Sequence, residues 1–472
     1  MSAFSRLDHH RGRVALIDGD GDGDGRAVTY DEMLAAGATI GHAAARFGKR
    51  GLVVVVCRND VDCVAGYVGL MRAGMAVLML HHSLPAAHLD AIVARFFPGL
   101  LYAPAGLSPL GRPLAALGGY LLSDLGNAPP ALHADLALLL TTSGTTGSRT
   151  LVRLSTANIV ANAQSIGQYL EIGPDERAIT TLPLSYSYGL SVLHSHLLRG
   201  ASVVLTEDGV VSPGFWRAMR DQRVTSLAGV PFVYDMLKKL RFARMPLPAL
   251  RTLTQAGGRM APEMVAEFAE ICAATGRRLI VMYGQTEATA RISWLPWPEA
   301  RRRPDSIGKA IPGGRLWLED DDGNPVTRPG TVAELVYGGA NVSLGTAETA
   351  ADLGRGDDNG GILRTGDLAE RDADGYFRVV GRRKRFLKLF GTRVNLDELE
   401  HLLAQAGVEC ACTGGDDHLV VHASAADAGT VKAAVAAHTG LGPQMFRVAL
   451  LAAVPRQESG KVDYRALEAD HG

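Results

Sequence analysis

The segment Thr142-Ser-Gly-Thr-Thr-Gly-Ser148 combines hydroxyl side chains with two glycines, a composition that suits phosphate binding. The glycines at 144 and 147 let backbone N–H groups turn toward an anion, and Ser and Thr hydroxyls bind phosphate oxygens. The segment follows the apolar run Leu136 to Leu140 and precedes a helix expected from Thr156 to Leu170. The G-x-x-x-x-G-K spacing of a Walker loop is missing. Alone, the segment fits a phosphate-binding loop or an ordinary Ser/Thr/Gly turn.

Further segments follow this loop in one order, and the set is more specific than any member. They are Tyr283-Gly-Gln-Thr-Glu287, Arg364-Thr-Gly-Asp-Leu368, Gly381-Arg382 with Lys388 and Gly391, and Pro455-Arg-Gln-Glu-Ser-Gly-Lys461. Together they resemble the superfamily of acyl-CoA synthetases, adenylation domains of nonribosomal peptide synthetases, and luciferases. The resemblance covers nearly the whole chain, from the Val28-Thr-Tyr-Asp-Glu-Met33 segment to Lys461. It implies an adenylate-forming enzyme that requires ATP and Mg²⁺.

The resemblance also implies a nucleotide site. Its phosphate-binding loop would consist of Thr142, Ser143, Gly144, Thr145, Thr146 and Gly147. Thr145 and Glu287 match positions that hold Mg²⁺ on the phosphates, a role suited to hard oxygen ligands. The adenine site would be formed by Ala256, Gly257, Gly258, Tyr283 and Gly284, with Gln285 and Thr286 in the same motif. Asp367 and Arg382 match the ribose contacts, because a carboxylate accepts hydroxyl hydrogens and Arg donates. Without its motif, Asp367 would be read as an Asp that caps a turn.

Lys461 is the expected central catalytic residue, with Glu287 beside it in the catalytic set. Negative charge builds on the α-phosphate and the attacking carboxylate oxygen as pyrophosphate leaves, and a mobile ammonium stabilises that charge. Out of context, a lysine in this position would be a surface residue. In the superfamily the small domain rotates about a hinge residue that aligns with Lys384. A second loop, Lys388 to Gly391, would line the tunnel for the thiol.

The chain departs from the family pattern in two places. After the phosphate loop the family has Pro-Lys-Gly, whereas this chain has Arg149-Thr150-Leu151. Arg149 or Arg153 is therefore a candidate source of the missing positive charge. In the segment Leu182-Pro-Leu-Ser-Tyr-Ser-Tyr-Gly-Leu190 an expected histidine is Tyr186. Tyr186 and Tyr188 would face the acyl substrate, with a packing role as the alternative.

The elements that position these segments alternate between helix and strand. Thr29-x-x-Glu32 is a capping box that opens a helix, and Gly48 ends it. A strand from Leu52 to Cys57, a helix from Val61 to Arg72 and a strand from Met75 to Leu80 form a βαβ succession, which implies a parallel sheet. The Asp-Gly repeat from Asp18 to Gly25 suggests calcium at first sight, but a hairpin turn between Val14–Ile17 and Ala27–Tyr30 is the favoured interpretation.

The expected fold class is α/β. Residues 1–383 form a large N-terminal adenylate-forming domain of several sheets flanked by helices, and residues 384–472 form a small, mobile C-terminal α+β domain. In the small domain Asn395-x-x-Glu398 caps a helix, and Thr430 to His438 is a second helix. The expected strands are Leu419 to His422 and Val448 to Val454.

Composition narrows the functional classes. Lys plus Arg (48) nearly equals Asp plus Glu (49), so no net field directs the chain to nucleic acid or to an anionic membrane. Five cysteines without paired spacing argue against a disulfide framework, and Cys410-x-Cys412 is too close for a usual zinc pair. The polar segment Met1 to Arg13 is unlike a signal peptide, and the apolar runs are too short to span a membrane. A cytoplasmic location is the expectation.

These observations predict ATP-dependent, AMP-forming activation of a carboxylic acid and transfer of the acyl group to a thiol. The expected partners are a small carboxylic acid and either coenzyme A or a carrier-protein phosphopantetheine supplied in trans. No Asp lies in the segment Ser185 to Leu190, where relatives that activate amino acids hold the α-ammonium, so a plain organic acid is favoured. Transfer to an amine or another nitrogen nucleophile is the alternative within the enzyme class. A degenerate, non-catalytic nucleotide-binding protein is the alternative from another class.

Overall fold

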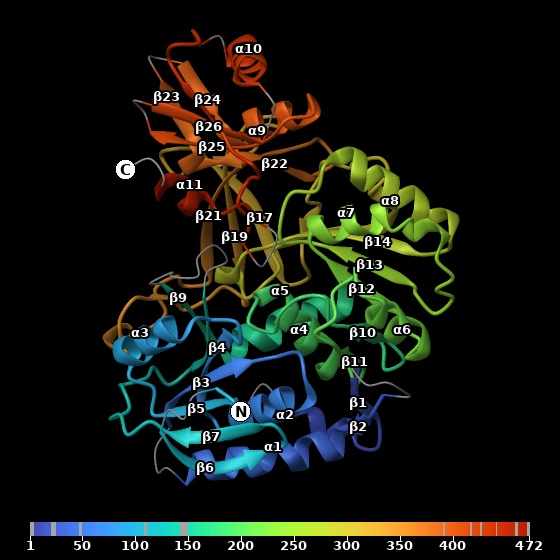
Figure 1. Cartoon of the computed structure of the whole chain (residues 1–472), viewed down its shortest axis with the longest axis vertical. Helices are drawn as coiled ribbons and strands as arrows, with labels where there is room; N and C mark the ends of the chain where they lie inside the picture. The colour runs from blue at the N-terminus through green and yellow to red at the C-terminus, as the bar shows by residue number, and fades with distance from the viewer. Residues whose placement is uncertain are drawn as a thin grey trace. The chain divides into compact units, whose positions relative to one another are not determined.

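The computed structural model describes residues 4–19, 25–46, 50–107, 111–141, 150–389, 392–415, 418–424, 427–439, 441–457 and 461–469. The chain divides into two compact units, each described here by itself. Unit 1 comprises Met1–Arg315 and Gly338–Leu363, and unit 2 comprises Leu316–Tyr337 and Arg364–Gly472. Both units are mixed α/β, as the sequence predicted (Figure 1). The expected hinge between residues 383 and 384 stays a prediction, because compactness alone does not locate a hinge.

The sheet that carries most of the predicted nucleotide segments lies in unit 1. Its strands in spatial order are β16 (Lys309–Ala310), β15 (Ser293–Leu295), β14 (Arg278–Tyr283), β13 (Thr252–Gln255), β12 (Ser226–Gly229), β10 (Arg177–Ile179), β11 (Ser202–Leu205), β1 (Val14–Asp18) and β2 (Ala27–Thr29). The strands from β14 to β1 are parallel. Strands β15 and β2 run antiparallel to them, and β16 pairs antiparallel with β15. The carboxyl ends of β12, β13 and β14 therefore meet at one edge, where open α/β sheets bind ligands.

A second sheet of unit 1 contains the predicted βαβ succession. Its strands in spatial order are β20 (Gly345–Ala347), β9 (Leu151–Ser155), β8 (Leu136–Thr141), β4 (Ala76–His81), β3 (Leu52–Cys57), β5 (Leu100–Pro104), β7 (Tyr120–Asp124) and β6 (Arg112–Leu117). Strands β3, β4, β5 and β8 are parallel, as the sequence predicted for β3 and β4. The helices of unit 1 are α1 (Tyr30–Ala45), α2 (Val61–Arg72), α3 (Ala86–Phe96), α4 (Thr156–Tyr169), α5 (Ser187–Leu198), α6 (Pro213–Asp221), α7 (Pro231–Lys239) and α8 (Pro262–Ala274).

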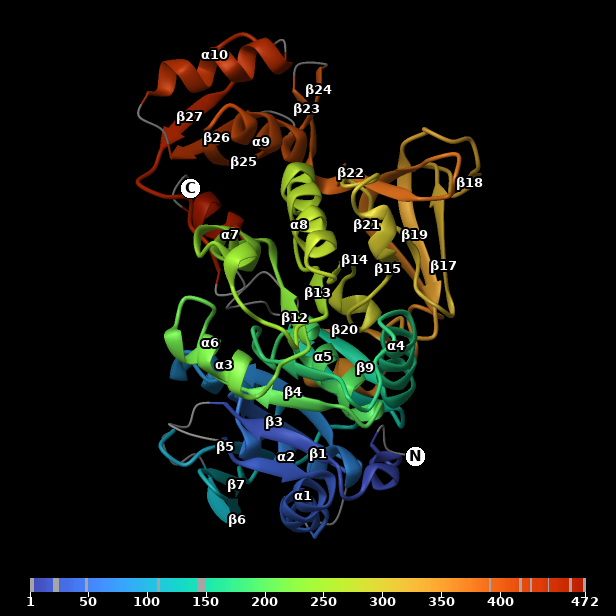
Figure 2. The same ribbon diagram turned by 90° about the vertical axis from the view of Figure 1, so that its right-hand side faces the viewer.

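One apolar core joins the two sheets of unit 1. It contains Leu16 and Val203 from the first sheet and Val55 and Val77 from the second, all fully buried. Helices α1 and α2 pack against each other beside this core (Figure 1). Their crossing requires glycine, because a Cβ added to Gly69 would lie 1.9 Å from a backbone oxygen of α1. Helices α4 and α5 also lie side by side (Figure 2), and α5 carries the predicted tyrosine segment.

Unit 2 contains three smaller sheets. The first orders β18 (Pro325–Val326), β17 (Gly314–Glu319), β19 (Ala333–Gly339), β21 (Ile362–Arg371) and β22 (Phe377–Arg382). The second pairs β23 (Phe386–Leu389) with β24 (Thr392–Asn395), and the third orders β25 (Glu409–Gly415), β26 (His418–Ser424) and β27 (Arg447–Leu450). Helices α9 (Leu396–Gln405), α10 (Ala428–Thr439) and α11 (Tyr464–Ala469) belong to the same unit. Leu399 of α9, Val421 of β26 and Val435 of α10 meet in its core.

The local predictions agree closely with these bounds. The Thr29 hydroxyl accepts a hydrogen bond from the Glu32 backbone N–H, and the Glu32 carboxylate accepts one from the Thr29 N–H, so the capping box is confirmed. Strands β1 and β2 pair antiparallel, which confirms the hairpin, although its Asp-Gly residues 20–24 lie outside the described part. The strand predicted from Val448 to Val454 ends earlier, at Leu450. The side chains of Asn395 and Glu398 also lie outside the description.

Candidate active site

The predicted phosphate-binding residues lie outside the described part of the chain. These residues are Thr142, Ser143, Gly144, Thr145, Thr146 and Gly147. The strands on either side, β8 and β9, are antiparallel neighbours, and Thr141 pairs with Leu151. The sequence signal therefore lies in the connection between two adjacent, buried strands. The proposed role of these residues in binding phosphate stays a prediction.

Arg153, one candidate for the missing loop cation, is committed to a buried network in unit 1. Its side chain is fully buried on β9. Its guanidinium donates to Asp358 Oδ2 at 2.6 Å and to the backbone oxygens of Leu344, Thr346, Arg355 and Gly356 at 2.6 to 3.2 Å. Binding a phosphate would require these bonds to break. The compensation hypothesis therefore rests on Arg149, which lies outside the described residues.

The predicted segment from Tyr283 to Glu287 forms a tight turn after β14. A Cβ at Gly284 would lie 1.8 Å from the backbone oxygen of Ala290, so this position admits only glycine. Gln285 Nε2 donates to the Tyr283 hydroxyl at 3.1 Å. Thr286 and Glu287 lie in a one-turn 3₁₀ helix, Thr286–Ala288. The Glu287 backbone oxygen accepts a hydrogen bond from the Ser343 N–H at 2.8 Å. These contacts fix the backbone from which the half-buried Glu287 carboxylate projects.

Beyond Glu287 the backbone is strained. Thr289 has φ 63°, in the left-handed region that a β-branched residue rarely adopts. Its hydroxyl donates to the Asn341 backbone oxygen at 2.7 Å, and Asn341 Nδ2 donates back to the backbone oxygens of Ala288 and Arg291, each at 2.8 Å. Strain of this kind persists where the surroundings determine the backbone, and it clusters at functional sites.

The predicted adenine segment follows β13 and contacts the tyrosine segment. Gly257 has φ 82°, and a Cβ there would lie 2.6 Å from the Tyr186 hydroxyl. Gln255 Nε2 donates to the Gly258 backbone oxygen at 2.8 Å. Burial raises the pKa of Tyr186 to about 12, so its hydroxyl stays protonated near neutral pH. The structure thus brings the predicted adenine and acyl segments together in unit 1.

A hydroxyl pair joins the tyrosine segment to the Glu287 turn. Ser187 Oγ and Thr286 Oγ1 are 3.1 Å apart and both residues are buried. Tyr188 is also buried, and its hydroxyl donates to the Thr254 backbone oxygen at 3.0 Å. Tyr186, Ser187 and Tyr188 therefore link the ends of β13 and β14. Contact of Tyr186 and Tyr188 with an acyl substrate stays a prediction, and the Tyr188 hydroxyl already has a protein partner.

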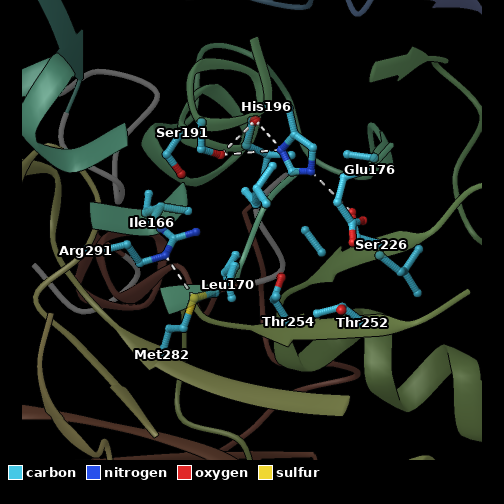
Figure 3. A pocket seen from close by; sticks show the side chains of 16 residues that line it. Ile166, Leu170, Glu176, Ser191, His196, Ser226, Thr252, Thr254, Met282 and Arg291 are labelled. Atoms are coloured by element: carbon cyan, nitrogen blue, oxygen red, sulfur yellow. Dashed lines mark hydrogen bonds between the residues drawn. The ribbon is translucent and has the colours of Figure 1, made fainter. Parts of the chain in front are cut away.

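Sequence reasoning passed over Arg291, which follows the Glu287 turn by four positions. Its side chain is 2% exposed, and its guanidinium carbon lies 4.0 Å from the centre of the Tyr188 ring. It borders a small cavity between helices α4 and α5 and strands β10, β12, β13 and β14 (Figure 3). The sequence did contain a signal for Arg291: it is a charged residue in the run Ala288 to Ile292, whose other residues are small or apolar.

The predicted ribose contacts pair with each other in unit 2. Asp367 on β21 is the register partner of Arg382 on β22, and Arg382 Nε lies 3.2 Å from Asp367 Oδ1. Asp367 is 3% exposed, whereas 64% of the Arg382 side chain is exposed. The pair therefore presents an oriented carboxylate beside an accessible guanidinium. Hydroxyl recognition is chemically possible there and stays a prediction.

The basic stretch after β22 is held by acidic partners within unit 2. Arg383 bonds to Glu334 at 2.8 Å and to Asp321 at 2.9 Å. Arg385 bonds to Asp397 and Glu400, each at 2.5 Å, and stacks on Tyr464 at 4.2 Å. Both arginines therefore have ionic partners without any acceptor molecule. The side chains of Lys384, the predicted hinge, and Lys388, the predicted tunnel residue, lie outside the description.

Lys461 lies at the base of a hairpin in unit 2. Arg456 and Val462 form an isolated antiparallel bridge, and the Gln457 N–H donates to the Lys461 backbone oxygen at 2.8 Å. Val462 and Tyr464 pack around Val454, Ala411 and Leu467. The Lys461 side chain is half-buried. These contacts anchor the backbone of Lys461. The catalytic role of Lys461 stays a prediction.

No described helix is long and apolar enough to cross a membrane. Among the described residues there is no group of three or more His, Cys, Asp and Glu side chains able to hold a metal ion, and this includes the surroundings of Cys410 and Cys412. Glu287, a single hard oxygen donor, suits a Mg²⁺ ion that arrives with a nucleotide, because such an ion keeps phosphate and water ligands.

The chain is similar to known proteins in sequence and in fold. The family model described as AMP-binding enzyme matches residues 4–346. Sulfoacetate–CoA ligase from Cupriavidus necator is 31% identical over 93% of this chain and 91% of its own length. The probable nonribosomal peptide synthetase CymA from Salinispora arenicola is 29% identical over 89% of this chain, which spans only 5% of that protein. The structure of O-succinylbenzoate coenzyme A synthetase from Bacillus subtilis with AMP matches this chain with a TM-score of 0.79 at 21% identity. The match covers 99% of this chain and 98% of that one, so the two proteins share the fold.

Proposed function

The chain belongs to the family of AMP-binding enzymes, and on that premise we propose that it is an AMP-forming acid–thiol ligase. It uses ATP to activate a carboxylic acid as an acyl-adenylate and transfers the acyl group to a thiol. The observation that carries this proposal is that the Gly257 and Tyr283–Glu287 segments follow the carboxyl ends of two adjacent parallel strands and are linked through Tyr186 and Ser187. Ligands of open α/β sheets bind at this edge.

Two half-reactions follow from this assignment. In the first, a carboxylate oxygen of the acid attacks the α-phosphorus of ATP, and the bond to pyrophosphate breaks. In the second, the thiol sulfur attacks the acyl carbon, AMP leaves with its bonding electron pair, and the thiol proton is released. Positioning and electrostatic stabilisation account for most catalysis of phosphoryl and nucleotidyl chemistry.

The chain's own residues divide this work. Lys461 places an ammonium against the charge that builds on the α-phosphate and carboxylate oxygens. Glu287 would hold Mg²⁺, which would neutralise phosphate charge when the nucleotide is bound. Asp367 accepts hydrogen bonds from the ribose hydroxyls, and Arg382 donates beside it. The fixed turn around Gly284 supports the role of Glu287, and the Asp367–Arg382 ion pair supports the shared ribose role.

Coenzyme A is the acceptor that we propose, because the ligase from Cupriavidus necator matches over 91% of its length. A carrier protein supplied in trans is the second candidate, favoured by the match to a nonribosomal peptide synthetase. Arg383 and Arg385 do not discriminate between them, since both already have acidic partners. A site for the 3′-phosphate of coenzyme A needs charge-assisted contacts from other cations.

The first experiment is acid-dependent exchange of labelled pyrophosphate into ATP, with a panel of carboxylic acids. The proposal expects exchange with at least one acid before any thiol is added. The second experiment supplies a fixed amount of acyl-adenylate and varies coenzyme A against a phosphopantetheinylated carrier protein. Thioester formation with the carrier at micromolar concentration, while millimolar coenzyme A gives none, would reverse the choice of acceptor. Product with hydroxylamine alone would exclude both thiols.

A further inference from the structure

Arg291 is a buried cation without an anionic partner in the described structure. Nε donates to the thioether sulfur of Met282 at 3.4 Å, a weak acceptor, and Nη1 donates to the Ala290 backbone oxygen at 3.4 Å, a long N–H···O contact. Nη2 makes no hydrogen bond to any described residue, and no described carboxylate lies within ion-pair distance. The Tyr188 ring supplies a cation–π contact at 4.0 Å, which offsets only part of the cost of removing a guanidinium from water.

The cavity beside Arg291 distinguishes it from another buried arginine. Arg277 is also buried, stacks on Phe242 at 5.4 Å and has one guanidinium nitrogen without a partner. Arg277 does not border the cavity, and Nη2 donates to the Leu247 backbone oxygen at 3.1 Å. A buried, stacked arginine can therefore be purely structural in this fold. Arg291 differs because it lines the cavity.

The cavity walls permit an anionic group only near Arg291. Ser191 and Thr254 contribute hydroxyls to the lining, and Ile166, Leu170 and Met282 contribute apolar surface (Figure 3). Burial lowers the pKa of His196, another lining residue, so its imidazole stays neutral. The lining carboxylate, Glu176, lies at the opposite end in Figure 3 and is already bonded to Arg251 at 3.0 Å and to the Thr225 hydroxyl. Arg291 is thus the positive end of the cavity.

Arg291 is connected to the proposed acyl site through tyrosines. Its guanidinium stacks on Tyr188, the Tyr186 and Tyr188 ring centres are 6.4 Å apart, and the Tyr186 hydroxyl closes against Gly257. The main chain gives a second connection, because Arg291 follows Glu287 by four residues. A substrate whose carboxylate reaches the Glu287 turn would therefore direct its far end toward Arg291. The cavity volume of about 20 Å³ suits a small terminal group.

We propose that this cavity receives a second anionic group of the acid substrate, and that Arg291 is the cation that binds it. The substrate class is a short acid with a carboxylate or sulfonate at the end opposite the reacting carboxylate. Both groups present anionic oxygens to the guanidinium, and bidentate contact would satisfy the nitrogen that now lacks a partner. This inference rests on the proposed function and specifies its substrate. Arg291 acts here in specificity.

The test compares acids of matched length in the pyrophosphate exchange assay. Succinate is paired with butanoate, and sulfoacetate is paired with propanoate. Each pair isolates the effect of the second charge, and comparison of the two pairs distinguishes a carboxylate from a sulfonate. The wild-type protein should prefer at least one dianion by about a hundredfold in kcat/KM. Arg291→Met should remove that preference, mainly by raising KM for the dianion, and should leave KM for ATP within about twofold. Arg291→Lys should restore part of it.

Arg277→Met is the matched control, because it removes a buried, stacked arginine away from the cavity. It should leave the preference for dianions unchanged, even if the protein is less stable. Preference of the wild type for monoanions would overturn the inference while the proposed function stands. An equal loss for all acids in Arg291→Met would show a structural role and also overturn it.

Failure of exchange with every acid would count against the proposed function, and binding then tests the cavity. Succinate and sulfoacetate should each be titrated alone while thermal unfolding is followed. A rise of the unfolding midpoint in the wild type and in Arg277→Met, absent in Arg291→Met, would support the anion site. No rise with either dianion in the wild type would overturn it.

Discussion

The wall around Tyr188 in unit 1 and the basic stretch from Arg382 to Arg385 in unit 2 are held by different forces. Hydroxyl pairs, aromatic contacts and tight glycine turns fix the wall, and its members are mostly buried. Ion pairs hold the stretch, and the side chains of Arg382 and Arg383 are 64% and 49% exposed. Exposed ion pairs contribute about 0–1 kcal/mol and exchange partners at little cost. The wall is thus suited to preorganised recognition, and the stretch to rearrangement.

Arg385, at the end of the basic stretch, is held more firmly than Arg382 and Arg383. Only 14% of its side chain is exposed, and it connects Asp397 and Glu400 to the ring of Tyr464. Burial acts to lower the pKa of Arg385, but the two carboxylates and Tyr464 outweigh it and raise the pKa above its usual value. Lys384 lies between the exchangeable pairs of Arg383 and this fixed cluster. The role of Lys384 as a hinge stays a prediction.

The largest effect should come from Lys461→Ala. Loss of one preorganised cation should reduce adenylate formation by roughly two to four orders of magnitude. Thioester formation from chemically made acyl-adenylate should largely survive, because the domain rotation that the family resemblance implies would remove Lys461 from that step. Single-turnover assays of each half-reaction measure both. Lys432→Ala, on α10 of the same unit, should change neither, and equal loss in both half-reactions would refute the separation of roles.

Arg153→Met tests whether unit 1 depends on buried charge as well as on packing. The substitution removes every hydrogen bond that the buried Arg153 guanidinium donates to Asp358 and to four backbone oxygens, so the free energy of unfolding should fall by roughly 3 kcal/mol. Urea unfolding of unit 1, followed by hydrogen exchange at β9 and β20, measures it. Arg355→Met is the control, because Arg355 pairs with the same Asp358 at 3.0 Å but is 53% exposed. If Arg153→Met raised the KM for ATP and left the stability unchanged, Arg153 would instead be assigned to phosphate binding.

Tyr188→Phe tests whether the Tyr188 hydroxyl contributes only to the stability of the wall. It deletes the hydrogen bond to Thr254 and keeps the ring under Arg291, so the expected cost is about 1 kcal/mol of stability. KM for the acid should change by no more than about threefold, which acid-dependent exchange measures. Tyr30→Phe removes another buried hydroxyl, bonded to the Leu197 and Ala201 backbone oxygens, and should lower stability similarly. A kinetic loss confined to Tyr188→Phe would mean that its hydroxyl contacts substrate.

Thr150→Ala should have the smallest effect, with KM for ATP within about twofold of the wild type. Arg149→Ala should raise that KM several-fold if Arg149 supplies the missing cation, since charge-assisted phosphate contacts are strong. ATP dependence of the exchange rate measures both. If Arg149→Ala has no effect and Thr150→Lys raises activity steeply, the loop is impaired and compensation is refuted.

Local signals predicted the fold well because they depend on neighbouring residues. The Thr29 capping box, the β3–α2–β4 succession and the pairing of β1 with β2 are encoded within short stretches. The sequence could not show that residues 316–337 join the second unit while 338–363 return to the first. That division depends on contacts between distant segments, for which neither periodicity nor capping gives a signal.

The candidate site was predicted only in part for the same reason. Motifs identified the segments that contain Glu287, Asp367 and Arg382, because each segment is short and recognisable. The pairing of Asp367 with Arg382 emerged only from the structure. Arg153 and Arg291 were misjudged or overlooked, since their environments come from elsewhere in the chain. Asp358, the partner of Arg153, is 205 positions away, and Tyr188, the partner of Arg291, lies on another element. Composition cannot distinguish a buried cation from an exposed one.

The network of Arg153 also sets an order of events during synthesis of the chain. Its partners at residues 344–358 leave the ribosome only after residues 316–337, which belong to the other unit. At about 5–20 residues per second, translation of the intervening 205 positions takes roughly 10–40 seconds. For that interval the nascent β9 edge carries a charge that cannot yet be buried. Unit 1 is therefore completed late, after residues 316–337 of the other unit have been synthesised.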